Sequence, residues 1–204
     1  MIILRIVKAK SRQDKSTPDD YTILRRKGRA VKDDKWIERF LHRAAYGTLA
    51  TSSGNQPFLN FLTFVYDEKK GVIYFHTAHK GRTRTNIEDN PNVCFGVAKI
   101  GRFLPGATAM EFSNEYASVM VYGKARVIGN MGEARKAMLM LMDKYFSHLK
   151  PGRDYKPMTD HEVEITTVYK LAIEQWVGKK NDQPDNKPGA FFYDDTKRKS
   201  SQKK

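Results

Sequence analysis

The sequence predicts a mainly β protein in which six antiparallel strands close into a barrel, with two or three helices packed at its ends. Three observations support this fold class. Six short runs with strand-like composition follow one another along the chain, mostly without an intervening helix. Alternating βαβ units are absent from the pattern. The chain also lacks the G-x-G-x-x-G and G-x-x-x-x-G-K-[ST] loops, which disfavours a Rossmann or P-loop site.

The first predicted element is a helix that begins at Asp33 or Asp34, because either side chain can cap a helix N-terminus. Apolar residues then recur at helical spacing until Gly47, which ends the helix. A short strand over 48–52 follows, and the turn cluster SSGNQP bounds it. Residues 57–66 are rich in Phe, Leu, Val and Thr and are predicted as the second strand.

The turn DEKKG separates that strand from a third one over 72–77, and the turn length favours an antiparallel hairpin. Residues 82–89 are predicted as a short helix. This helix stops at Asn90-Pro91 because proline cannot continue a helix. Residues 92–98 are the fourth predicted strand.

Residues 99–115 have no clean period and carry Gly and Pro, so we expect a loop or insertion there. Residues 116–128 alternate in polarity and predict a long strand. An amphipathic helix is predicted over 133–145, and a loop over 149–160. The last long strand is predicted over 163–177.

The charge distribution indicates one domain with two basic ends. The formal net charge is +14, of which residues 1–35 carry +6 and residues 187–204 carry +4, leaving +4 for all the rest. We therefore expect a flexible basic lead over 1–20, one domain over 21–180 and a largely disordered basic tail over 181–204.

The composition excludes several protein classes. A single cysteine, Cys94, excludes a disulfide scaffold and an all-cysteine metal site. No apolar run approaches the roughly 20 residues that a membrane-spanning helix needs. The opening MIILRIV is too short for the core of a signal peptide, so we expect a cytoplasmic protein. Aromatic and basic residues are not interleaved in the way a nucleic-acid stacking platform needs, which makes nucleic acid the least favoured partner.

The most informative stretch is YFHTAHKGRTRTNIEDNP, residues 74–91. It predicts a strand, a turn through Lys80, and a helix start, where free backbone N–H groups and the helix dipole favour an anion. Thr77 and Thr83 add hydroxyl donors, and Arg82 can bind a phosphate with two hydrogen bonds. The alternative is a solvated basic helix start with no ligand.

The order of these elements resembles the flavin-binding split barrels related to pyridoxamine-phosphate oxidase. The shared features are a helix, an LAT strand, a hairpin with a YDEKKG turn, a basic helix start, an NP stop and a VCF strand. Within that superfamily the H-x-A-x-x-G pattern and the lead-in over 25–51 resemble the Nim branch, named for nitroimidazole resistance. The resemblance covers about residues 22–180 and implies a split β-barrel.

The resemblance also implies FMN bound non-covalently at the interface of a homodimer. Matching residue by residue, it places the FMN phosphate at Arg82 and Thr83. Relatives often carry lysine or arginine in place of Thr83, and Lys80 or Arg84 could compensate. The other implied contacts are His76 and Thr77, the backbone of Phe61, Leu62 and Thr63 along the isoalloxazine, and Trp176, with Lys179, closing the site. The expected loop 99–115 is a candidate lid over the partner's flavin or part of the interface.

His76 is the candidate catalytic residue, because a neutral imidazole beside the flavin could relay a proton near neutral pH. The alternative is a buried histidine that donates one hydrogen bond to the backbone. His76 and His79 are three residues apart, but no third ligand lies at a recognisable spacing, so we expect no metal site. We interpret Met138 and Met142 as core filler.

The sequence therefore favours an FMN-dependent oxidoreductase of the Nim-like group, with nitro-aromatic or related small molecules as candidate substrates. A true pyridoxamine-phosphate oxidase is disfavoured because no basic ending for a substrate phosphate follows Trp176. The alternative is a flavin-binding or haem-binding redox carrier or sensor without turnover. The phosphate motif does not separate a carrier from an enzyme, because both need it.

Overall fold

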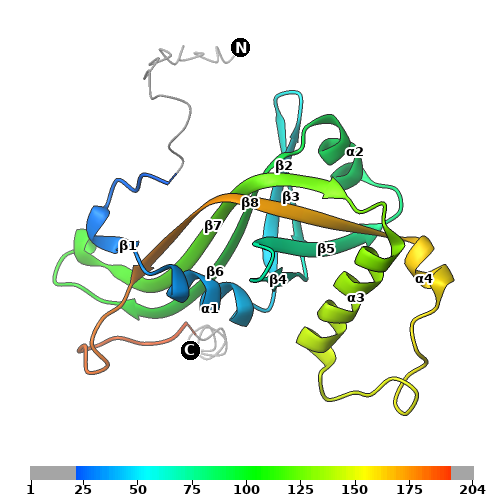
Figure 1. Cartoon of the computed structure of the whole chain (residues 1–204). Helices are drawn as coiled ribbons and strands as arrows, with labels where there is room; N and C mark the ends of the chain where they lie inside the picture. The colour runs from blue at the N-terminus through cyan, green and yellow to red at the C-terminus, as the bar shows by residue number, and fades with distance from the viewer. Residues whose placement is uncertain (1–21, 194–204) are drawn as a thin grey trace, which may run out of the picture.

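The computed structural model describes residues 22–193, and the expected lead over 1–20 lies outside them. Over the described range, eight strands form one antiparallel sheet in the order β3-β2-β6-β7-β8-β5-β4, with β1 paired to β8 (Figure 1). The strands are β1 (Ala30–Val31), β2 (Gly47–Ser53), β3 (Gln56–Leu62), β4 (Val65–Asp67), β5 (Val72–Ala78), β6 (Asn92–Leu104), β7 (Ser113–Val127) and β8 (Thr166–Asn181). The mainly β, antiparallel prediction is confirmed.

The sheet curls back on itself because its two end strands are neighbours in the chain. β3 pairs with β2, β4 pairs with β5, and only Thr63 and Phe64 separate β3 from β4. The ends of the sheet therefore meet at this break, as expected for a split barrel. Phe64 is fully buried inside, and its N–H and C=O both bond to the Tyr145 hydroxyl, at 3.0 and 2.9 Å.

The strand number was predicted as six and is eight. The predicted strand 57–66 is two strands, β3 and β4. The break occurs because the Phe64 N–H donates to the hydroxyl of Tyr145 in α3 instead of to a neighbouring strand. The second strand that was not predicted is β1. It has only two residues and pairs with Lys179 and Gly178 of β8. Such a short run has no detectable period in the sequence.

Four α-helices flank the sheet, with α1 near the end where β6 and β7 protrude and α3 and α4 at the opposite end (Figure 1). Their bounds are α1 (Asp34–Arg43), α2 (Arg82–Asp89), α3 (Met131–Phe146) and α4 (Asp160–Glu164). The first three were predicted. The short α4 was not, and its capping box between Thr159 and Glu162 delays the start of β8 to Thr166.

The expected loop over 99–115 is mostly strand, which corrects the prediction. β6 and β7 stay paired out to Leu104 and Ser113, across a bulge between Ile100 and Phe103. The Arg102 guanidinium binds both carboxylate oxygens of Glu115 across the hairpin, at 2.6 and 2.8 Å. This long-range ion pair stabilises strands whose local sequence has no clean period, and only residues 105–112, with a 3-10 turn at Ala109–Glu111, connect them.

The chain beyond β8 was expected to be disordered from residue 181, but the described part packs on the sheet. Asn181 still belongs to β8. Arg102 donates to the carbonyl oxygens of Gln183, Pro184 and Asp185, and Phe191 forms a bridge with Phe103. The rest of the predicted tail, 194–204, lies outside the described residues.

Two apolar clusters form the core. The larger fills the barrel under α1 and includes Leu41, Phe75 and Tyr169. The smaller lies between α3 and strands β4, β5 and β8, and includes Tyr74 and Leu141. Among the described helices none is both long and apolar enough to cross a membrane.

Candidate functional site

Hydrogen bonds between side chains fix helix α2 on the sheet. Asn60 of β3 donates to the Thr83 hydroxyl at 3.1 Å, and Asn86 donates to the Thr51 hydroxyl of β2 at 2.9 Å. Asn86, Thr51 and Thr83 are all buried. A buried polar pair is costly to break, because each group left alone loses its only partner. The first turn of α2 is therefore held rigidly beside the end of β3.

The N-terminus of α2 has the features of an anion site. Its N-cap is Gly81, with φ +151°, a conformation that favours glycine, and no side chain caps the first turn. Arg82 is exposed and its guanidinium lies 5.4 Å from the centre of the Phe58 ring. Arg82 also borders a pocket of about 380 Å³. Free backbone donors, the helix dipole and an unpaired guanidinium together suit a phosphate.

The other cations of this segment are placed differently. Arg84 donates to Glu88 at 2.7 Å and to the His79 carbonyl at 3.1 Å, so its guanidinium is already engaged. Lys80 is exposed in the turn before the helix. Of the two residues that could compensate for Thr83, only Lys80 makes no hydrogen bond or ion pair within the described residues. A lysine adds positive charge near a phosphate but cannot form the paired hydrogen bonds of a planar guanidinium.

Strand β5 carries His76 and Thr77 toward the same end of the sheet. The Thr77 hydroxyl lies 3.1 Å from the Tyr169 hydroxyl and donates to the Ala78 carbonyl at 2.9 Å. His76 is exposed, yet desolvation by its neighbours lowers its pKa below the ordinary value. The imidazole is therefore neutral at pH 7 and can both accept and donate a proton.

The predicted isoalloxazine contacts lie at the end of β3. Phe61 is 67% exposed and Leu62 is half-buried against the barrel core. Thr63, just past the strand, lines a pocket of about 440 Å³ together with His76. The structure thus brings the end of β3 and His76 to one cavity.

Trp176 lies far along β8 from His76 within one chain. Its indole N–H donates to Asp34 at 2.9 Å, and its ring packs edge-on against Tyr66 at 6.4 Å. His76 pairs with Val168 of β8, and Trp176 is eight residues further along that strand. At roughly 3.3 Å per residue this is a path of about 26 Å along β8, an upper bound on the direct separation because the sheet curves and carries a bulge there.

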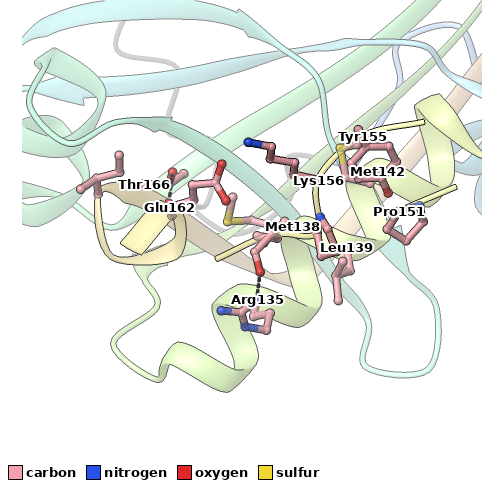
Figure 2. A pocket seen from close by; sticks show the side chains of 12 residues that line it. Arg135, Met138, Leu139, Met142, Pro151, Tyr155, Lys156, Glu162 and Thr166 are labelled. Carbon is pink, nitrogen blue, oxygen red and sulfur yellow. Dashed lines mark hydrogen bonds between the residues drawn. The ribbon is translucent and has the colours of Figure 1, made fainter. Parts of the chain in front are cut away.

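Met138 of α3 packs against the smaller core cluster, as its interpretation as core filler predicts, but Met138 and Met142 also line pockets. Met138 and Met142 are half-buried and border the His76 pocket. With Met158 they also border a second pocket of about 540 Å³ between α3 and the loop that carries Pro151 and Tyr155 (Figure 2). The amphipathic pattern correctly identified the apolar face of α3. It did not predict that pockets lie along part of this face.

Lys144 is a residue that sequence reasoning missed. Its Nζ donates to the Phe64 carbonyl at 2.9 Å and lies 3.8 Å from the centre of the Phe64 ring. Burial lowers the pKa of Lys144 to about 8. Helical spacing could have identified Lys144 as a partly buried lysine, because it follows Leu141 by three residues and so lies on the apolar face of the helix.

Comparisons with known proteins agree with this geometry. The family model described as pyridoxamine 5'-phosphate oxidase matches residues 33–180. The fold is similar to the flavocytochrome Anf3 from Azotobacter vinelandii, with a TM-score of 0.71 and 21% identity over 89% of this chain and 80% of that one. It is also similar to a putative 5-nitroimidazole antibiotic resistance protein from Bacteroides thetaiotaomicron, with a TM-score of 0.60 and 21% identity over 76% and 90% of the two chains.

A further similar structure is the FAD and heme binding protein from Mycobacterium smegmatis, with a TM-score of 0.67 and 17% identity over 86% of this chain and 80% of that one. No protein of curated function shows a significant match to the chain.

Proposed function

The chain belongs to the pyridoxamine 5'-phosphate oxidase family, and from that premise we propose that it is an FMN-binding oxidoreductase. The observation that carries the proposal is the N-terminus of α2. Gly81 leaves its backbone donors uncapped, and Arg82 is free of any carboxylate in the described residues. This arrangement suits the terminal phosphate of FMN, which carries nearly two negative charges at neutral pH.

The remaining contacts of the proposed flavin are those that the family resemblance implies, two of which, Thr63 and His76, share one pocket. With the phosphate at Arg82 and Thr83, the isoalloxazine lies along the backbone of Phe61 to Thr63, within reach of His76 and Thr77. Bound flavin supplies the electron chemistry. The protein's part is to orient the flavin, and the neutral imidazole of His76 can hold or release a proton at the acceptor.

We further propose that the working unit is a homodimer. Trp176 and His76 both belong to the predicted flavin contacts, yet about 26 Å of β8 separates them in one chain. In the proposed dimer, a second copy would supply Trp176 to the flavin that His76 contacts. Leu59 and Phe61 of β3 are 55% and 67% exposed, which supports burial of this strand against another chain.

Flavin titration tests the proposal. Purified protein should quench FMN fluorescence to saturation, show flavin absorption bands and elute at the mass of a dimer. Because similar structures include proteins named for FAD, FAD is titrated in parallel, and the proposal expects FMN to bind at least as tightly. A colourless, folded protein that ignores both flavins contradicts the proposal. Oxidation of a reduced nicotinamide with a nitro-aromatic acceptor would then separate an enzyme from a carrier.

A second candidate is a redox carrier that binds haem, and one observation favours it. His76 is neutral and shares its pocket with Met138 and Met142, and neutral imidazole and thioether are both axial haem ligands in proteins. Two of the similar structures are named as a flavocytochrome and as an FAD and heme binding protein. Haem titration should then produce a Soret band that His76→Ala abolishes, whereas a flavin-only protein produces none.

A further inference from the structure

The pocket that His76 shares with α3 points to a substrate class. We propose that it selects an uncharged, apolar, ring-sized molecule and rejects phosphorylated ones. This inference rests on the proposed flavin site, because it names the substrate that would lie beside the flavin. It departs from what the family's description suggests, since the substrate of a pyridoxamine-phosphate oxidase carries a phosphate.

The lining of the pocket carries the inference. Eight residues form it, and most are apolar: Thr63, His76, Met138, Leu141, Met142, Tyr145, Phe146 and Met158. Burial raises the pKa of Tyr145 and lowers that of His76, so both are neutral at pH 7. The pocket therefore presents no charged lining residue to its contents. A phosphate moved from water into such a site would lose its hydration without gaining a cation.

Nearby cations are already engaged by the protein. Lys144 donates to the Phe64 carbonyl and is not among the lining residues. In the adjoining pocket, which Figure 2 shows, Arg135 donates to the Met158 carbonyl at 2.7 Å. Arg135 also pairs with Asp160. Neither side chain can turn to a phosphate in the His76 pocket without breaking a bond to the protein.

The volume of the pocket and its few polar lining residues indicate the size and polarity of the substrate. About 440 Å³ falls within the range of sites for small molecules, which are mostly apolar with a few polar groups. Here Thr63 and His76 supply the polar edge on the side where the flavin is proposed. Met138, Met142 and Met158 line both pockets, and flexible thioethers adapt to several shapes. Longer apolar molecules could therefore extend into the second pocket.

A matched pair of probes tests the charge preference. 4-Nitroanisole and 4-nitrophenyl phosphate share one ring and differ chiefly in the phosphate. Equilibrium dialysis of the full chain is done with saturating FMN, or with excess inorganic phosphate if FMN does not bind, so that the proposed phosphate site at Arg82 is occupied. The dissociation constant should be at least about tenfold lower for 4-nitroanisole. Equal constants for the two probes, or tighter binding of the phosphate, would overturn the inference.

Three variants locate the effect. Met142→Lys should weaken 4-nitroanisole about tenfold and tighten 4-nitrophenyl phosphate, a gain that a misfolded protein cannot show. Met142→Leu alters the shape of the pocket wall but adds no charge, so the lower constant for 4-nitroanisole should persist. Met110, which is 97% exposed, lies outside both pockets, so Met110→Lys controls for added charge. An unchanged ratio of the two constants in Met142→Lys would place the probe elsewhere and refute the assignment.

The outcome is separable from that of the flavin proposal. If FMN fails to bind but the preference for 4-nitroanisole persists and Met142→Lys reverses it, only the flavin proposal falls. If FMN binds while the preference is absent, only the substrate inference falls. Haem that displaces 4-nitroanisole and yields a Soret band through His76 would identify haem as the occupant and overturn the inference.

Discussion

Replacing Arg82 by alanine should weaken FMN binding, because this guanidinium is the only arginine at the first turn of α2 without a protein partner of opposite charge in the described residues. A hydrogen bond to a charged group contributes about 1.5–3 kcal/mol. That loss corresponds to a dissociation constant raised by about 10- to 150-fold. Arg82 is exposed over the Phe58 ring, so screening by water places the expected change near the lower bound.

Arg84 supplies the matched control two residues away. Its guanidinium is held by Glu88 and by the His79 carbonyl, so it is not available to a phosphate. Arg84→Ala removes the same charge from the same helix and should change the FMN dissociation constant by no more than about twofold. The two variants thus separate a direct contact from a general field of positive charge.

The assay is quenching of FMN fluorescence at fixed ionic strength, with thermal melting of each variant to confirm the fold. The ratio of the two dissociation constants, Arg82→Ala over Arg84→Ala, should be about five or more. If Arg82→Ala binds FMN like the wild type, the phosphate does not lie at this helix. If Arg84→Ala loses as much affinity as Arg82→Ala, long-range charge rather than contact explains the binding.

Two further predictions concern stability and the C-terminal segment. Burial lowers the pKa of Lys144 to about 8, so between pH 8 and 10.5 the unfolded chain binds a proton that the folded chain does not, and folding gains stability as pH rises through that window. Lys144→Met should therefore raise the unfolding free energy by about 1–2 kcal/mol at pH 7 and by less at pH 10.5. Urea denaturation at the two pH values measures the change. Equal gains in unfolding free energy at both pH values would contradict this explanation. Arg102→Ala removes the donor to the carbonyls of 183–185 and should speed hydrogen exchange in 182–193, and unchanged exchange there would show that other contacts hold the segment.

The helix α2 shows how far local signals reach. Its predicted span, 82–89, matches the observed helix, since a glycine turn starts it and Pro91 stops it. The predicted phosphate residues Arg82 and Thr83 accordingly lie where the sequence placed them, at the first turn. Which nearby arginine is free for a ligand could not be predicted, because Arg84 is engaged by a carbonyl in the preceding turn as well as by Glu88.

The hairpin of β6 and β7 shows where local signals fail. Residues 99–115 contain Gly and Pro and no period, so they were expected as a loop, yet Arg102 and Glu115 join them across the sheet. The split of 57–66 has a similar cause. Phe64 leaves the sheet because Tyr145, 81 residues later, supplies its hydrogen bonds. Such partners leave no trace in a window of neighbouring residues.

By itself the sequence determined the antiparallel β class, the basic motif at the start of α2 and the family resemblance, because turns, caps and strand alternation depend on neighbouring residues. Only the tertiary structure decided what the motif faces. It placed Met138, which also packs on the core, and Met142 along a pocket beside His76, and it left Trp176 outside the lining of that pocket within one chain. These are properties of contacts between distant segments, and the curl of the sheet determines them.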